Sequence, residues 1–140
     1  MSERGVLYVD TSAVLRAVLE SGVSPAIEAR IAAAEALVTS RLALVESSRA
    51  VLRLRQESRS SETALADAER EIESFWRRCE IFELTSSVCT LAASIAPQHA
   101  LRTLDALHAA TFVVARRRLG DVELVTADER LRRAVETSLG

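Results

Sequence analysis

The stretch that most constrains the fold runs from Leu101 to Ala115 and is apolar around nearly its whole circumference. This pattern predicts a helix with Thr103 as its N-cap, ended by the arginines 116–118 and Gly120. A helix without a broad polar side belongs in a core rather than on a surface. Asp105 lies in its first turn, where it could simply favour the helix dipole. A carboxylate on a buried helix otherwise has to be paired, bind a cation or line an opening.

Three further carboxylates, Asp10, Glu46 and Asp128, lie at comparable junctions between apolar elements. Asp10 directly follows the apolar run 6–9, and Asp128 comes shortly after the apolar run 122–125; both runs are predicted as buried strands. Glu46 lies in the first turns of a predicted helix. A single acid at such a position is weak evidence for a site, because Asp and Glu are common in first helical turns. Four acids at corresponding junctions form a stronger pattern.

Strands and helices alternate along the sequence. Strands are predicted at 6–9, 36–39, 80–84 and 122–125, and helices at 13–20, 25–34, 42–57, 62–77, 85–96, 103–115 and 129–136. Thr11 and Ser12 are expected to cap the first helix, Pro25 to begin the second, and residues 137–140 to be loose. The alternation predicts one α/β domain over residues 1–140, in three α/β/α layers around a central parallel sheet of four or five short strands.

The composition excludes several classes of protein. No apolar run approaches the roughly 20 residues of a membrane helix, and the first residues make a poor signal peptide. Cys79 and Cys89 lack metal-site spacing and are expected to be reduced thiols, so we expect a cytoplasmic protein. All 18 basic residues are Arg. The absence of Lys argues against phosphotransfer domains such as receivers and haloacid-dehalogenase-type phosphatases, both of which require one.

The carboxyl ends of parallel strands meet at one edge of the sheet, so the four acids are expected to converge there. Converging carboxylates repel one another and need either raised pKa values or bound cations. Ligands that are all oxygen favour Mg²⁺, with Mn²⁺ able to substitute, over Zn²⁺. Such ions can hold a phosphodiester and activate a water molecule. The hydroxyls of Thr11, Ser12 and Thr126 could orient a carboxylate or that water.

Four segments that carry these acids resemble the motifs of the PIN domain family. They are VLYVDTSA around Asp10, SRLALVE ending at Glu46, LDALHAAT around Asp105 and LVTADERL around Asp128. They follow the family's order and span nearly the whole chain. The resemblance is closest to VapC-type toxins of bacterial toxin–antitoxin pairs. Many members of the family add a short strand after the last helix, and none is visible before Gly140, so we expect a shorter sheet edge.

The resemblance implies a Mg²⁺-dependent endoribonuclease. Asp10 and Asp105 would be the main metal ligands, Glu46 and Asp128 would complete the catalytic site, and Ser12 and Thr126 would support it. It also implies a homodimer and a cognate VapB-type antitoxin that blocks the acidic groove, in a larger toxin–antitoxin assembly. A non-toxin PIN nuclease of RNA processing and a non-catalytic binding module with this fold are the alternatives.

Several conspicuous residues have a simpler explanation. His108 follows Asp105 by three positions, and we predict that it packs or hydrogen-bonds in the core rather than binding metal. Trp76 could stack on an RNA base, but its place in an amphipathic helix favours burial. Arg130 could approach a phosphate, although a surface ion pair is the simpler expectation.

Overall fold

The computed structural model describes residues 5–20 and 22–139. The predicted break at Ser21, the first four residues and Gly140 at the end of the predicted tail lie outside the described residues. The elements follow in the order β1 Val6–Val9, α1 Thr11–Leu19, α2 Pro25–Ala33, β2 Ala36–Ser40, α3 Arg41–Glu57, α4 Glu62–Arg77, β3 Cys79–Phe82, α5 Ser86–Ala92, α6 Thr103–Leu119, β4 Val122–Val125 and α7 Glu129–Leu139. The described strands form one parallel sheet in the order β3-β2-β1-β4, as the alternation predicts.

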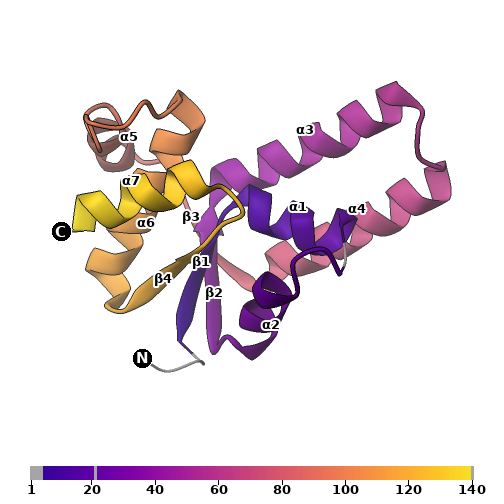
Figure 1. The fold of residues 1–140 in the computed structure, drawn as a ribbon, viewed down its shortest axis with the longest axis horizontal. Coiled ribbons are helices and arrows are strands. Elements are labelled where there is room, and N and C mark those ends of the chain that lie inside the picture. The colour runs from indigo at the N-terminus through magenta and orange to yellow at the C-terminus, as the bar shows by residue number, and fades with distance from the viewer. Residues whose placement is uncertain (1–4, 21, 140) are drawn as a thin grey trace.

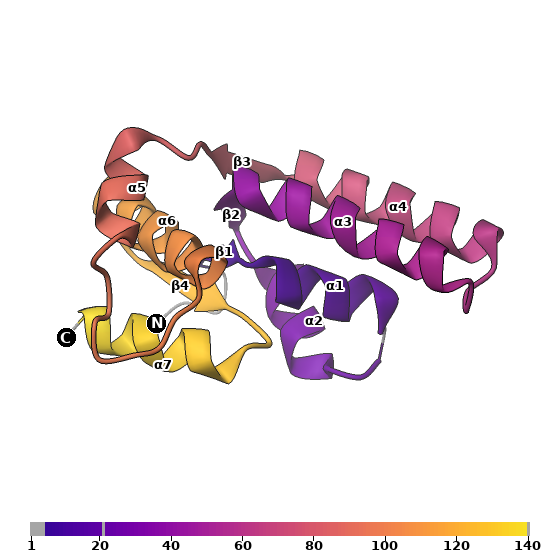
Figure 2. The same cartoon turned by 90° about the horizontal axis from the view of Figure 1, so that it is seen from above.

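Helices cover both faces of the sheet, which gives three layers. Figure 2 shows α1 to α4 on one side of the sheet and α5 to α7 on the other. The strand β1 lies between β2 and β4, so the C-terminal end of β1 is near the middle of the sheet edge (Figure 1). In the part of the chain that the structure describes, no helix is long and apolar enough to cross a membrane.

Alternating side chains of β1 divide the core into two halves, as the pleat of a strand requires. Leu7 and Val9 pack with the cluster under α1 to α4, which also contains Phe75 and Trp76 of α4. Tyr8 points to the opposite face and packs with Phe112 of α6. Burial on both faces explains why this strand has no charged residue before Asp10.

The helix α6 is buried in the second half of the core, as its apolar circumference predicts. Its residues 108–113 are all buried, and Gly120 caps its C-terminus with a positive φ of 88°. The predicted N-cap was wrong by one residue. Arg102 occupies the cap position without a side-chain hydrogen bond, and Thr103 is the first helical residue. Asp105 is therefore the third residue of the helix, close to its free N–H groups.

Other boundaries also differ from the prediction. Asp10 itself caps α1, so Thr11 and Ser12 are helical rather than capping residues. The strand β3 spans Cys79–Phe82 and α5 ends at Ala92, earlier than predicted. The described part of the predicted loose tail is helical, because α7 continues to Leu139.

The helices α3 and α4 form an antiparallel hairpin that projects beyond the sheet (Figures 1 and 2). The predicted apolar stripe of α4 is confirmed, since Leu65, Ile72, Phe75 and Trp76 are buried. Near the sheet, Trp76 Nε1 donates to Ser47 Oγ of α3 at 3.0 Å. At the far end, Arg55 forms ion pairs with Glu62 and Glu69 across the turn. The hairpin therefore has an apolar base and a charged tip.

Candidate active site

Asp10 is held rigidly where β1 passes into α1. Its Oδ1 accepts the Ala13 N–H at 3.0 Å and the Ser12 hydroxyl at 2.8 Å, and its Oδ2 accepts the Thr126 hydroxyl at 2.6 Å. The side chain is both the N-cap of α1 and a buried carboxylate with only 4% of the residue exposed. Burial raises the pKa of Asp10, and the hydrogen bonds from Thr126, Ala13 and Ser12 offset only part of that rise.

Residues that follow β4 complete the surroundings of Asp10. The sheet register aligns Val9 with Val125, which places Thr126 next to Asp10. Thr126 Oγ1 also accepts the Asp128 N–H at 2.9 Å. Asp128 in turn caps α7, because its Oδ1 accepts the N–H of Arg130 at 2.9 Å. The Thr126 hydroxyl therefore contacts two of the predicted acids, because it donates to the Asp10 carboxylate and accepts the Asp128 N–H. The sequence predicted that this hydroxyl could orient a carboxylate.

Glu46 lies on α3 and contacts both α1 and α6. Its Oε1 accepts the Thr11 hydroxyl at 2.7 Å and lies 2.6 Å from His108 Nε2. Burial opposes ionisation of Glu46, but the hydrogen bonds from His108 and Thr11 outweigh it, so the pKa of Glu46 is lowered. His108 is buried and bonds to Tyr8 Oη through Nδ1 at 2.7 Å. The prediction that His108 is a packing and hydrogen-bonding residue is confirmed.

Asp105 lies in the first turn of α6 and is partly exposed. Burial and the charge of Asp128 raise its pKa, and the charges of Glu46 and Asp10 add to the rise. All three other predicted acids thus act electrostatically on Asp105. These influences come from residues at the end of β1, on α3 and in the segment before α7, and the convergence of the four carboxylates into one site stays a prediction.

An open cleft of about 560 Å³ lies over this edge. Asp105 and Asp128 line it, and Ser12 joins it to the buried Asp10. Three arginines, Arg16, Arg102 and Arg130, also line the cleft. The cleft therefore combines carboxylates suited to a cation with guanidinium groups suited to phosphate.

Arg130 differs from the expectation of a surface ion pair. Among residues 5–20 and 22–139 no carboxylate lies within ion-pair distance of Arg130, whereas Arg132 pairs with Glu129 at 2.9 Å. The guanidinium of Arg130 is left at the cleft wall.

The donor set suits a hard divalent cation, because every predicted ligand is a carboxylate oxygen. The carboxylates are not arranged as a compact cage. Across the described residues, no group of three or more His, Cys, Asp or Glu side chains is placed to hold a metal ion. The chemistry of the residues fits Mg²⁺ or Mn²⁺, while the ligand set stays a prediction.

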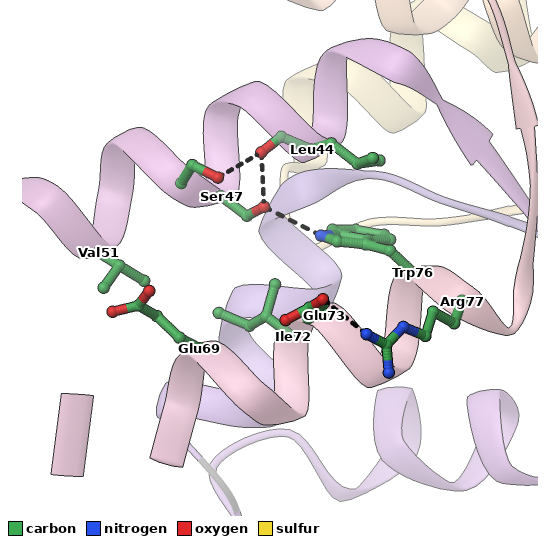
Figure 3. Close-up of a pocket in the computed structure, with 9 residues that line it drawn as sticks. Leu44, Ser47, Val51, Glu69, Ile72, Glu73, Trp76 and Arg77 are labelled. Atoms are coloured by element: carbon green, nitrogen blue, oxygen red, sulfur yellow. Dashed lines mark hydrogen bonds and ion pairs between the residues drawn. The ribbon is translucent and has the colours of Figure 1, made fainter. Parts of the chain in front are cut away.

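A second hollow of about 420 Å³ lies between α3 and α4, away from these acids. Figure 3 shows Trp76, Ile72 and Val51 along it, with Glu73 and Arg77 paired at its edge. Only 7% of Trp76 is exposed and its N–H is satisfied by Ser47, so the prediction of burial is confirmed. Trp76 is not available as a stacking platform in the acidic cleft.

Sequence patterns missed two features of the site. Tyr8 was assigned only to the buried strand, although a hydroxyl in a fully apolar strand requires a partner. Arg16 and Arg102 were not singled out, and only the position of Arg102 just before the helix of Asp105 could have drawn attention to it. The signal was weak because surface arginines are frequent in this sequence.

Comparison with known proteins places this geometry in a family. The family model described as PIN domain matches residues 7–136. The chain is 35% identical over 128 residues to Ribonuclease VapC45 and to Ribonuclease VapC49, each from a strain of Mycobacterium tuberculosis, covering 90% of this chain and 86% of each relative.

Two solved structures share the fold. The crystal structure of PAE2754 from Pyrobaculum aerophilum aligns with a TM-score of 0.64 at 20% identity, over 96% of this chain and 86% of the other. VapBC2 from Rickettsia felis, bound to a DNA fragment from their promoter, aligns with a TM-score of 0.57 at 14% identity, over 88% of this chain and 99% of the other. The chain belongs to the PIN domain family and is similar throughout its matched length to PIN ribonucleases of the VapC type.

Proposed function

We propose that this protein is a divalent-metal-dependent endoribonuclease and the toxin of a toxin–antitoxin pair. The observation that carries this proposal is a cleft lined by Asp105, Asp128 and three arginines, with the buried Asp10 joined to Asp128 through the Thr126 hydroxyl. Its membership of the PIN family and its similarity to two ribonucleases named VapC support the assignment. The substrate would be an RNA strand whose phosphates lie along the cleft.

Asp10 and Asp105 would be the main metal ligands, with Glu46 and Asp128 contributing directly or through water. When bound, Mg²⁺ or Mn²⁺ supplies the activation of water and the charge neutralisation that phosphodiester hydrolysis requires. Ser12 and Thr126 keep the Asp10 carboxylate in one orientation by donating to it. This preorganisation lets Asp10 accept a cation without first reordering its surroundings.

The cleft arginines would position the RNA. Arg102 and Arg130 would each contact a phosphate, because a guanidinium fork matches phosphate oxygens. Arg16 already pairs with Glu20 at 3.0 Å, which makes it a weaker candidate. The arginines would also offset the repulsion between the acidic cleft and a polyanion.

The partners proposed for this chain are a second copy of itself and a VapB-type antitoxin, in a larger assembly. The antitoxin is supported by the fold shared with VapBC2 from Rickettsia felis, whose structure includes a DNA fragment from their promoter, and the second copy rests on the family resemblance alone. An antitoxin segment over the arginines and acids of the cleft would exclude RNA by occupying the same surface. Light scattering of the purified chain, alone and with the product of a neighbouring small reading frame, tests both partnerships.

The central test is RNA cleavage by the full chain with Mg²⁺ and with a chelator. Asp10→Asn and Asp105→Asn are expected to abolish Mg²⁺-dependent cleavage while the circular dichroism spectrum is retained. Asp67→Asn is the matched control, because Asp67 is an exposed acid on α4 that, among the residues the structure describes, pairs with Arg70 alone. Cleavage by either cleft variant at the parental rate would refute the site. RNA binding without cleavage by the parent would favour the non-catalytic module, and cleavage without toxicity on expression would favour an RNA-processing nuclease.

A further inference from the structure

A buried chain of hydrogen bonds reaches Glu46 from the opposite side of the sheet. It begins at Tyr8 on β1, passes through His108 on α6 and ends at Glu46 on α3. Tyr8 is 0% exposed and His108 is 3% exposed. The roles proposed above for metal and phosphate use neither residue. A polar chain kept in the core at this depth has to be satisfied throughout, and here each member has a partner.

The direction of the chain follows from the chemistry of its last member. A carboxylate can only accept, so His108 Nε2 carries the hydrogen that points to Glu46 Oε1. In the neutral ring, Nδ1 is then the acceptor for the Tyr8 hydroxyl, at 2.7 Å. A Tyr8 hydroxyl that donates to Nδ1 favours the neutral tautomer whose Nε2–H points to Glu46, and a hydrogen bond of this kind is a recognised means of orienting a residue at a metal site.

Both donors to Glu46 reach the same oxygen. His108 Nε2 and the Thr11 hydroxyl approach Oε1 at 2.6 and 2.7 Å. Within the described part of the chain, no hydrogen-bond donor reaches Oε2. The Glu46 side chain keeps 24% of its surface exposed, although His108 beside it is buried. One oxygen of Glu46 is therefore anchored in the core, and the other is uncommitted.

We propose that Tyr8 and His108 are positioning residues that fix the Glu46 carboxylate so that Oε2 is available to a divalent cation or to its bound water. This inference rests on the proposed metal-dependent function. It differs from that function because it assigns a role to two core residues that touch neither RNA nor metal. The role is to prevent Glu46 from rotating its free oxygen away from the other carboxylates.

The experiment measures Mn²⁺ affinity of the full chain by isothermal titration calorimetry, with no RNA present. Tyr8→Phe removes only the hydroxyl, and His108→Leu removes both ring nitrogens. Each is expected to weaken Mn²⁺ binding by roughly 10- to 100-fold, the usual cost of losing a group that orients a metal ligand. Phe112→Leu is the control, because Phe112 packs edge-on against Tyr8 at 5.8 Å without a hydrogen bond to this chain. It should leave the affinity unchanged.

Two further measurements separate positioning from a loss of core packing. His108→Gln keeps an N–H donor near the place of Nε2, and it should restore much of the affinity lost in His108→Leu. In a Glu46→Gln background, Tyr8→Phe should cause no further loss, because its effect is transmitted through Glu46. The inference would be overturned if Tyr8→Phe and His108→Leu left the Mn²⁺ affinity unchanged. It would also be overturned if Tyr8→Phe caused the same loss of Mn²⁺ affinity in the Glu46→Gln background as in the parent. Absence of Asp10-dependent Mn²⁺ binding in the parent would instead overturn the proposed function together with it.

Discussion

The hydroxyl of Thr126 provides the sharpest test of how Asp10 is held. Thr126 is fully buried and donates to a carboxylate at 2.6 Å. Thr39 is equally buried and donates at the same distance of 2.6 Å, but to the neutral carbonyl of Val9. The substitutions Thr126→Val and Thr39→Val thus remove the same group from the same degree of burial. They differ in the charge of the acceptor and in the Asp128 N–H and Ser12 hydroxyl, which also contact Thr126 Oγ1.

The expected losses of unfolding free energy follow from that difference. A hydrogen bond to a charged group contributes about 2 kcal/mol, and the Asp128 N–H left without Thr126 adds about 1 kcal/mol, so Thr126→Val should cost about 3 kcal/mol. Thr39→Val loses a neutral bond and should cost about 1 kcal/mol. With a urea slope of about 2 kcal/mol/M, the two midpoints should differ by about 1 M.

The assay is urea unfolding followed by circular dichroism, in chelator at pH 8 and at decreasing pH. Burial raises the pKa of Asp10, so its carboxylate takes up a proton early as the pH falls. The bond from Thr126 then becomes a neutral one, and the gap between the two variants should shrink. Equal losses at pH 8, or a gap that stays constant with pH, would refute the view that Thr126 stabilises an ionised Asp10.

Three other predictions concern separate parts of the molecule. Burial and the charge of Asp128 raise the pKa of Asp105, so the stability that depends on its protonated form is lost as pH rises through that pKa. The unfolding free energy of Asp105→Asn should therefore rise relative to that of the parent between pH 4 and pH 8 in chelator. A constant difference in unfolding free energy across that range would contradict this prediction. Phe112→Ala empties a site that is 1% exposed and should cost about 3–5 kcal/mol in urea unfolding, whereas a cost below about 1 kcal/mol would mean that the core of α6 is not packed as described. Burial raises the pKa of Cys79 to about 12, so iodoacetamide at pH 8 should label the exposed Cys89 first; both cysteines lie in the tryptic peptide 79–102, and fragment-ion mass spectrometry of that peptide showing equal labelling would disprove this.

Apolar patterning was sufficient to predict the sheet and the alternation of strands and helices. The run before Asp10 is apolar at every position, and its alternating burial on two faces is what a central parallel strand requires. The caps were harder to predict, because Asp10, Thr11 and Ser12 are all good capping residues and only the abrupt end of β1 makes Asp10 the one that caps.

Long-range contacts left no local signal in the sequence. His108 is separated from Tyr8 by 100 positions and from Glu46 by 62 positions, and no spacing rule connects residues so far apart. The end of α7 was missed for a different reason. Thr137 and Ser138 look like tail residues, yet their hydroxyls donate to carbonyls one turn earlier and stay within the helix.

The contrast between the two ends of the α3–α4 hairpin implies a gradient of local stability along it. At the base, Trp76 and Ser47 are shielded from solvent, whereas at the tip Arg55 meets Glu62 and Glu69 on the surface. Surface ion pairs weaken as dissolved ions screen them, while buried contacts do not. Amide hydrogens near the tip should therefore exchange with deuterated solvent faster in concentrated sodium chloride, and those near the base should keep their protection. Opening of the hairpin would then begin at its outer end, and the turn of α3 that carries Glu46 would be the last part to be disturbed.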